Sequence, residues 1–170
     1  MIFEKMLSSD HPYTLEATRY IAASSGKDGM IGGQVIDIEN ENTKISLELL
    51  NELHALKTGA LIRAACVMGA ILSGADSKAC ELMGEFGSLI GMAFQVKDDI
   101  LDKIGDAKEL GKPVGSDEKN NKTTYLTYFD CEECENIVKE LTDRAEKILD
   151  NYENSEFLKK LINYLIYRTN

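Results

Sequence analysis

Three aspartates and a glutamine occupy one short stretch of this sequence at spacings that suit metal chemistry. Gln95, Asp98, Asp99 and Asp102 lie at i, i+3, i+4 and i+7, which in a helix places the four side chains on one stripe about two turns long. Carboxylates this close repel one another. Mg²⁺ would relieve the repulsion, because it prefers carboxylate oxygens and completes its coordination with water and substrate phosphates. The stripe therefore predicts one half of a Mg²⁺–diphosphate clamp.

An acidic run on a helix is often only a solvated surface, so the residues around this stripe matter. The carboxylates here are interleaved with the apolar residues Phe94, Val96, Ile100, Leu101 and Ile104. A helix of this composition buries much of its surface. A functional interpretation of the charges is therefore favoured.

Length and composition limit the class of protein. The chain has 170 residues, two prolines, no tryptophan and a net charge of −10, and its long runs of helical periodicity predict a single all-α domain. The negative charge argues against nucleic acid as a general partner. No stretch reaches roughly 18 unbroken apolar residues, so no membrane span is expected. The first residues lack the apolar core of a signal peptide, and four cysteines then favour a reducing cytoplasm.

Hydrophobic periodicity and helix-capping residues place the elements. Ser46 is a predicted N-cap for the helix that carries Lys57, and Ser77 for the helix that carries the acidic stripe. The segment 105–121 has no apolar periodicity and is interpreted as a functional loop, because strong helical segments flank it. Helices are predicted over about 13–24, 30–39, 46–68, 77–104, 123–129, 131–152 and 155–168.

Three lysines are candidates for binding an anion. Lys57, followed by Thr58, lies at the edge of an apolar stripe, where a lysine usually extends to solvent. Lys112 and Lys122 follow the acidic stripe, and each alone would be an ordinary surface lysine. Together they could bring positive charge to a phosphate group that carboxylate-bound metal ions hold.

Four blocks of this sequence, in order, resemble the trans-isoprenyl diphosphate synthases (polyprenyl synthetases), especially farnesyl and geranylgeranyl diphosphate synthases. Their order and spacing agree from Gly29 to Tyr125. The blocks are Gly29–Ile38, similar to GM-x-GGQ-x-x-D; Lys57–Ile62, similar to KT-x-x-L/I; Phe94–Asp102, similar to FQ-x-x-DD-x-x-D; and Gly111–Tyr125, similar to GK-x-x-G-x-D…K-x-T-x-P, with Leu126 in place of the proline.

The resemblance implies an isoprenoid-synthase helical bundle and a prenyltransferase. Such an enzyme condenses isopentenyl diphosphate with an allylic diphosphate after Mg²⁺-assisted ionisation of the latter. The resemblance also implies roles for particular residues: Mg²⁺ binding by Asp98, Asp99 and Asp102; contact with the diphosphate by Lys57, Lys112 and Lys122; dipolar stabilisation of the cation and substrate by Thr58 and Gln95; shaping of the cavity wall by Phe94; and support behind these by Gln34 and Asp37.

One part of the family pattern has no counterpart in these 170 residues. The family's first aspartate-rich motif, the arginines after it and the residues that hold isopentenyl diphosphate are missing. We therefore expect residues 1–170 to form a single truncated domain that lacks the helices of the first motif and is inactive alone. Apolar faces left uncovered would favour self-association. A homo-oligomer, or a partner chain that supplies the missing motif, is thus expected.

Two other functions remain open at this point. The chain could be a non-catalytic interaction or regulatory subunit, or a truncated relic of the family. A class I terpene cyclase would share the ionisation chemistry, although such enzymes usually lack the KT and GK blocks in this arrangement.

Overall fold

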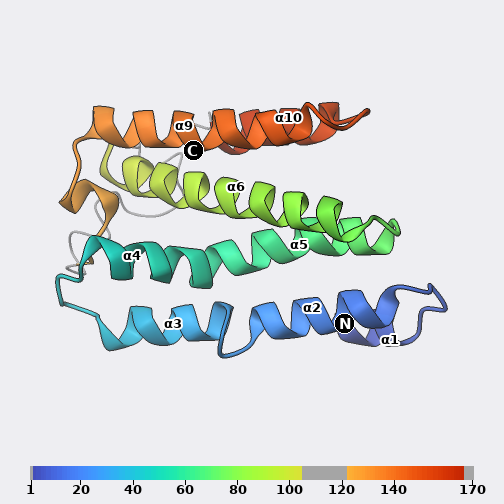
Figure 1. Cartoon of the computed structure of the whole chain (residues 1–170). Coiled ribbons are helices and arrows are strands. Elements are labelled where there is room, and N and C mark those ends of the chain that lie inside the picture. The colour runs from blue at the N-terminus through green and yellow to red at the C-terminus, as the bar shows by residue number, and fades with distance from the viewer. Residues whose placement is uncertain (1, 105–121, 167–170) are drawn as a thin grey trace.

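The computed structural model describes residues 2–104 and 122–166, and every regular element in these two ranges is a helix. The predicted all-α class is confirmed. Figure 1 shows the elements in chain order, which are α1 (Ile2–Leu7), α2 (Thr14–Ser25), α3 (Met30–Glu39), α4 (Leu47–His54), the π-helical turn η1 (Ala55–Gly59), α5 (Ala60–Leu72), α6 (Ser77–Ile104), the 3₁₀ turn η2 (Tyr125–Thr127), α9 (Cys131–Leu149) and α10 (Glu156–Ile166).

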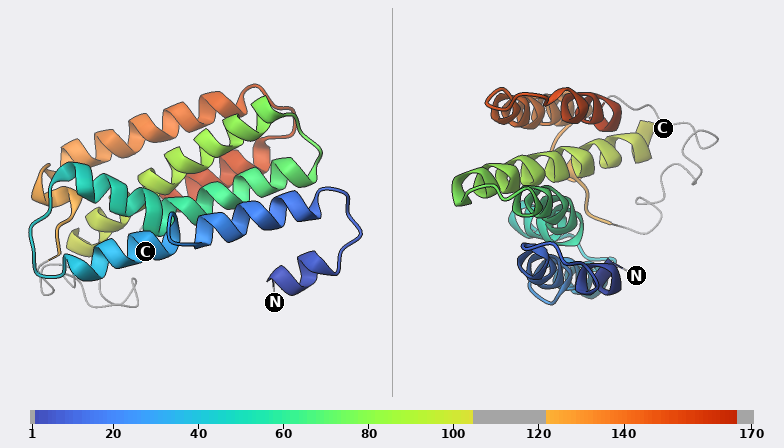
Figure 2. Two further views of the ribbon diagram at one scale, coloured as in Figure 1. Left: turned by 60° about the horizontal axis from the view of Figure 1, so that its bottom comes forward. Right: turned by 90° about the vertical axis from the view of Figure 1, so that its right-hand side faces the viewer.

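The helices stack as successive layers. Figures 1 and 2 show α9 and α10 on one side, then α6, then the α4–η1–α5 rod, and finally α2 and α3 on the other side. Helix α6 packs on both α5 and α9, and η1 packs on α3. The central helix α6 therefore carries the acidic stripe between two layers that hold it in place.

The main hydrophobic core holds α6 against its neighbours. It joins α4, α6, η2, α9 and α10, and its fully buried side chains include Leu50, Val96, Ile100, Leu149 and Ile162. Burying one such aliphatic side chain contributes roughly 1.5–3 kcal/mol. Because these contacts lie on the side of α6 that faces α9 and α4, they set the direction in which its carboxylates point.

Two glycines allow helix backbones to approach closely beside the acidic stripe. A Cβ at Gly91 of α6 would lie 2.9 Å from Cα of Gly59, and a Cβ at Gly33 of α3 would lie 2.3 Å from the backbone N of Lys57. Neither distance is compatible with a side chain. The first contact brings η1 onto α6, and the second brings α3 onto η1.

Three local predictions differ from the structure. The helix expected over 46–68 contains the π-helical turn Ala55–Gly59, and the helix expected over 123–129 is only a 3₁₀ turn that follows an extended Thr124. Ser77 begins α6 but does not cap it, because Oδ1 of Asp76 accepts the hydrogen bond from the Ala79 N–H at 2.8 Å. The predicted N-cap Ser46 does accept a hydrogen bond from the N–H of Leu49, at 3.2 Å. The predicted functional loop, 105–121, lies outside the described residues.

The rod formed by α4, η1 and α5 is unusually apolar. By length and composition alone, Leu47–Leu72 could cross a membrane, since its most apolar window has a mean hydropathy of 1.6. In the bundle it lies between α3 and α6. Of that window 22% is fully buried, and most of the other residues of the rod are partly buried.

Replacing Gly33 tests the contact between α3 and η1. We expect Gly33→Ala to lower the free energy of unfolding by roughly 1–3 kcal/mol, because the added methyl overlaps the Lys57 backbone. Gly69→Ala is the matched control, since nothing lies within 4 Å of its Cβ, and it should stabilise α5 by up to about 1 kcal/mol. Urea unfolding followed by circular dichroism compares the two. Equal effects would show that the close approach is absent.

Candidate diphosphate-binding site

A cavity of about 300 Å³ opens where α3, α4, η1, α6 and the segment before η2 meet. Its acidic lining comes from Asp37 on α3, from Glu41 just after α3, and from Asp98 and Asp99 on α6. Its basic lining comes from Lys57 on η1 and from Lys122. The cavity thus brings together ionisable residues that lie up to 85 positions apart in the sequence.

Two lysines share one carboxylate inside this cavity. Nζ of Lys57 donates to Oδ2 of Asp37 at 2.6 Å, and Nζ of Lys122 donates to both carboxylate oxygens of Asp37 at 3.2 Å. Burial alone would raise the pKa of Asp37, but the hydrogen bonds from the two lysines outweigh it, and the pKa lies below its ordinary value. Two cations and one anion leave this cluster with a net positive charge.

The π-helical turn and its neighbours place Lys57 and Thr58. A π turn inserts an extra residue and so rotates the side chains that follow it relative to a regular α-helix. Oγ1 of Thr58 donates a hydrogen bond to Oε1 of Gln95 on α6. This contact joins the block that contains Lys57 to the block that contains the acidic stripe.

The three carboxylates of the stripe lie in different surroundings. Asp98 is partly exposed and lines the cavity. Asp99 also lines it but is only 8% exposed, and its Oδ2 accepts a hydrogen bond from the N–H of Tyr125 at 2.8 Å. Asp102 is 4% exposed and is not among the lining residues. Within 2–104 and 122–166, no three Asp, Glu, His or Cys side chains converge in a way that could hold a metal ion.

His54 is a further polar residue at the cavity wall that no sequence motif had singled out. It is 7% exposed, its ring stacks on that of Tyr125 at 5.8 Å, and its Nδ1 has no hydrogen-bond partner in the described part of the chain. Burial, reinforced by the nearby charge of Lys57, lowers the pKa of His54 to about 4. The imidazole is therefore neutral at pH 7. It lies three positions before Lys57, on the same side of the rod.

Comparison with known proteins shows which family has this sequence and fold. The family model of the polyprenyl synthetases matches residues 1–165. The chain belongs to the polyprenyl synthetase family. It is 37% identical over 153 residues to farnesyl diphosphate synthase of Escherichia coli, and that match covers 87% of this chain and 51% of the relative. It is also 38% identical over 157 residues to a chloroplastic geranylgeranyl pyrophosphate synthase of Capsicum annuum, covering 91% of this chain and 42% of that one.

Solved structures of the family have the same fold. A geranyltransferase from Helicobacter pylori, crystallised with magnesium and isoprenyl diphosphate, is 31% identical, with a TM-score of 0.80, over 97% of this chain and 55% of its own. The chain thus spans about half the length of the relatives that it matches. The predicted resemblance to the polyprenyl synthetases is confirmed.

The structure brings most of the predicted site residues of this polyprenyl synthetase chain together, although their roles stay predictions. Lys57, Gln95, Asp98, Asp99 and Lys122 surround one cavity, and Thr58 joins it through its hydrogen bond to Gln95. Phe94 is partly buried and, like Asp102, is not among the residues that line it. Lys112 lies outside the described residues. Asp37, expected only to support the others, is the residue on which both lysines converge.

The pKa of His54 predicts how stability depends on pH. The folded chain keeps His54 neutral down to about pH 4, whereas the unfolded chain protonates it near pH 6.5. Its contribution to stability is therefore complete above pH 6.5 and is lost as the pH falls to about 4, by up to about 3 kcal/mol. Between pH 7 and pH 4 the free energy of unfolding should fall in both wild type and His54→Phe. We expect the fall to be larger in wild type, by up to about 3 kcal/mol. Parallel pH curves would contradict this environment for His54.

Proposed function

We propose that this chain forms one wall of the active site of an isoprenyl diphosphate synthase, namely the wall that carries the aspartates of the block Phe94–Asp102. The observation that carries the proposal is the convergence of Lys57 and Lys122 on Asp37, in the cavity that Asp98 also lines. The chain carries a net charge of −10, and the two lysines bring positive charge to a cavity whose lining has more carboxylates than ammonium groups. An anionic diphosphate would therefore need both the lysines and a divalent cation held by the carboxylates. Its most similar curated relatives include farnesyl and geranylgeranyl diphosphate synthases.

We assign the diphosphate of an allylic substrate to the two lysines. An ammonium group binds phosphate as a point charge, and both Nζ atoms already point at the same carboxylate. A diphosphate would share the two lysines with Asp37 and not replace it, because a carboxylate that is only 13% exposed needs a cationic partner. Lys112 would add a third positive charge, and isopentenyl diphosphate would be the second substrate, both on the family resemblance.

We assign Mg²⁺ to Asp98 in the first place. The donor chemistry fits, because a partly exposed carboxylate at the wall of a cavity that also holds two phosphate-binding candidates is the combination that Mg²⁺ uses. When bound, Mg²⁺ neutralises the charge that develops on a departing diphosphate. Within this chain, Lys57 and Lys122 bind and orient the diphosphate. The hydroxyl of Thr58 holds Gln95 so that its amide faces the cavity.

The site that these residues form is only half of the one that the chemistry requires. Asp98 and its neighbours do not make a complete metal-binding group in the described ranges, so we propose that the chain alone does not condense isopentenyl diphosphate. The remaining carboxylates and arginines would come from another chain or from a part of the protein beyond these 170 residues. Apolar surface is available for such an association, since Ile31, Val35 and Ile38 of α3 are 52%, 45% and 59% exposed.

The same incomplete metal group favours a second candidate function. A chain that keeps the bundle but lacks the opposing carboxylates could serve as a non-catalytic regulatory or interaction subunit. Such a subunit would not need Mg²⁺-dependent binding of diphosphate. Ligand binding therefore separates the two functions.

Isothermal titration with pyrophosphate tests the proposed site. We expect wild type to bind pyrophosphate more tightly with Mg²⁺ than without it, and Asp98→Ala to lose that difference. Lys122→Ala should weaken binding about tenfold or more, because a hydrogen bond to a charged group is worth roughly 1.5–3 kcal/mol. Lys139→Ala, an exposed lysine on α9, is the matched control and should bind like wild type. Equal affinity with and without Mg²⁺ would favour the non-catalytic subunit.

A further inference from the structure

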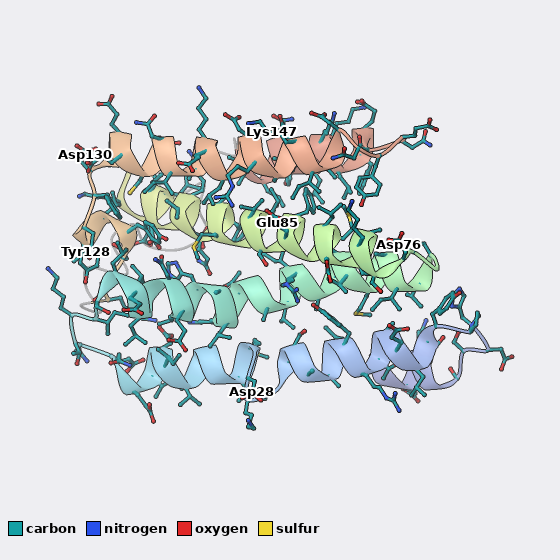
Figure 3. All side chains as sticks on the ribbon, in the orientation of Figure 1. Asp28, Asp76, Glu85, Tyr128, Asp130 and Lys147 are labelled. Atoms are coloured by element: carbon teal, nitrogen blue, oxygen red, sulfur yellow. The ribbon has the colours of Figure 1, made fainter. Side chains whose placement is uncertain are left out.

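Residues 122–129 form an extended segment and a 3₁₀ turn that cross the ends of α3, α4 and α6, and we call this segment the return strap. Lys122 at its beginning binds Asp37 on α3. Oγ1 of Thr123 accepts a hydrogen bond from the N–H of Ile45 at 3.1 Å. Tyr128, near its end, donates its hydroxyl to the carbonyl oxygen of Ile45, and Figure 3 shows Tyr128 at the end of the bundle where α4 begins. The return strap is thus held at both ends beside the cavity.

Tyr125 is the buried centre of the return strap. Its ring lies 5.8 Å from that of His54 on one side and 5.9 Å from that of Phe129 on the other. Its hydroxyl donates to Oδ1 of Asn51 and lies 3.4 Å from the sulfur of Met92. The side chain is 5% exposed. These contacts fix the ring, but the backbone of Tyr125 needs its own partner, because it is the first residue of η2 and its N–H has no acceptor within that turn.

Asp99 supplies that acceptor. Its Oδ2 lies 2.8 Å from the backbone N of Tyr125, and the carboxylate is 8% exposed. A hydrogen bond from a backbone N–H to a buried carboxylate is one of the stronger kinds in proteins. Lys122 lies only three residues before this anchor, so the position of the Tyr125 backbone determines how far Nζ of Lys122 can reach.

We propose that Asp99 is a positioning residue of this site, which acts through the Tyr125 backbone and not by binding a metal ion. In this view the two adjacent aspartates of the stripe have separate tasks. Asp98 is the carboxylate for the ion, whereas Asp99 holds the return strap so that Lys122 meets Asp37. The effect on ligand binding rests on the proposed function, but the anchoring of the strap does not.

Asparagine and alanine at position 99 separate the two roles. Asp99→Asn keeps an oxygen that can accept the Tyr125 N–H but removes the charge that a Mg²⁺ ligand needs. Asp99→Ala removes both. A positioning role predicts that asparagine substitutes for aspartate and alanine does not, whereas a metal ligand would be lost in both variants.

The experiment combines amide hydrogen exchange by NMR with titration of Mg²⁺ and pyrophosphate, on wild type and the two variants. We expect the Tyr125 amide to exchange at least about tenfold faster in Asp99→Ala and at nearly the wild-type rate in Asp99→Asn. The amide of Val138, buried in α9, is the internal control and should not change. Asp99→Asn should keep the Mg²⁺ dependence of binding. Asp99→Ala should weaken pyrophosphate binding as much as Lys122→Ala, and the double variant should be no weaker than either.

Two results would overturn the proposal. One is loss of Mg²⁺ dependence in Asp99→Asn equal to that in Asp98→Ala, which would make Asp99 a metal ligand. The other is an unchanged Tyr125 exchange rate in Asp99→Ala, which would remove the anchor. If wild type bound no pyrophosphate, the proposed function would fail, while the exchange rates would still decide the anchoring. If Asp99→Ala did not fold, Asp99→Asn alone would decide, since its Tyr125 exchange and Mg²⁺ dependence are both expected to stay.

Discussion

Two ammonium groups meet one carboxylate at the point where α3, the π-helical turn and the return strap come together. Lys57 and Lys122 are each about one-third exposed, and Asp37, between them, is 13% exposed. Partly buried charges are tolerated only when they are paired and hydrogen-bonded. The ion pairs therefore constrain the relative positions of three elements far apart in the sequence. Their two ammonium groups also lie in a cavity that Glu41, Asp98 and Asp99 line as well, so an incoming anion and a divalent cation would meet complementary charges there.

The rest of the described structure supports that arrangement. Gly33 lets α3 approach the backbone of Lys57, and Gly91 lets η1 approach α6. On its other side α6 is embedded in the main core, and Asp98 and Asp99 line the cavity. The bundle is thus organised around one charged junction. Apolar side chains of α3 stay exposed in this chain, which spans about half the length of the polyprenyl synthetases that it matches.

The sequence predicted what depends on local periodicity. The long amphipathic helices were found because apolar residues recur about every 3.6 positions, and the same geometry placed Gln95, Asp98 and Asp99 at the cavity. Features that depend on contacts between distant segments were not predicted. The π turn at Lys57, the central position of Asp37 and the buried His54 have no local signature. The helix expected over 123–129 was wrong because the Tyr125 N–H is bound by Asp99 and Thr124 is extended. The cap of α6 was assigned to Ser77 and not to Asp76 because either residue type caps a helix well.

A crystal structure of the chain soaked with pyrophosphate and Mn²⁺ tests the central claim most directly. The account predicts pyrophosphate within hydrogen-bonding distance of Nζ of Lys57 and Nζ of Lys122, with an anomalous Mn²⁺ peak at Asp98. Both lysines should then contact the ligand while at least one of them still pairs with Asp37. Pyrophosphate or Mn²⁺ bound elsewhere, with the Lys57–Asp37–Lys122 cluster unchanged, would contradict it.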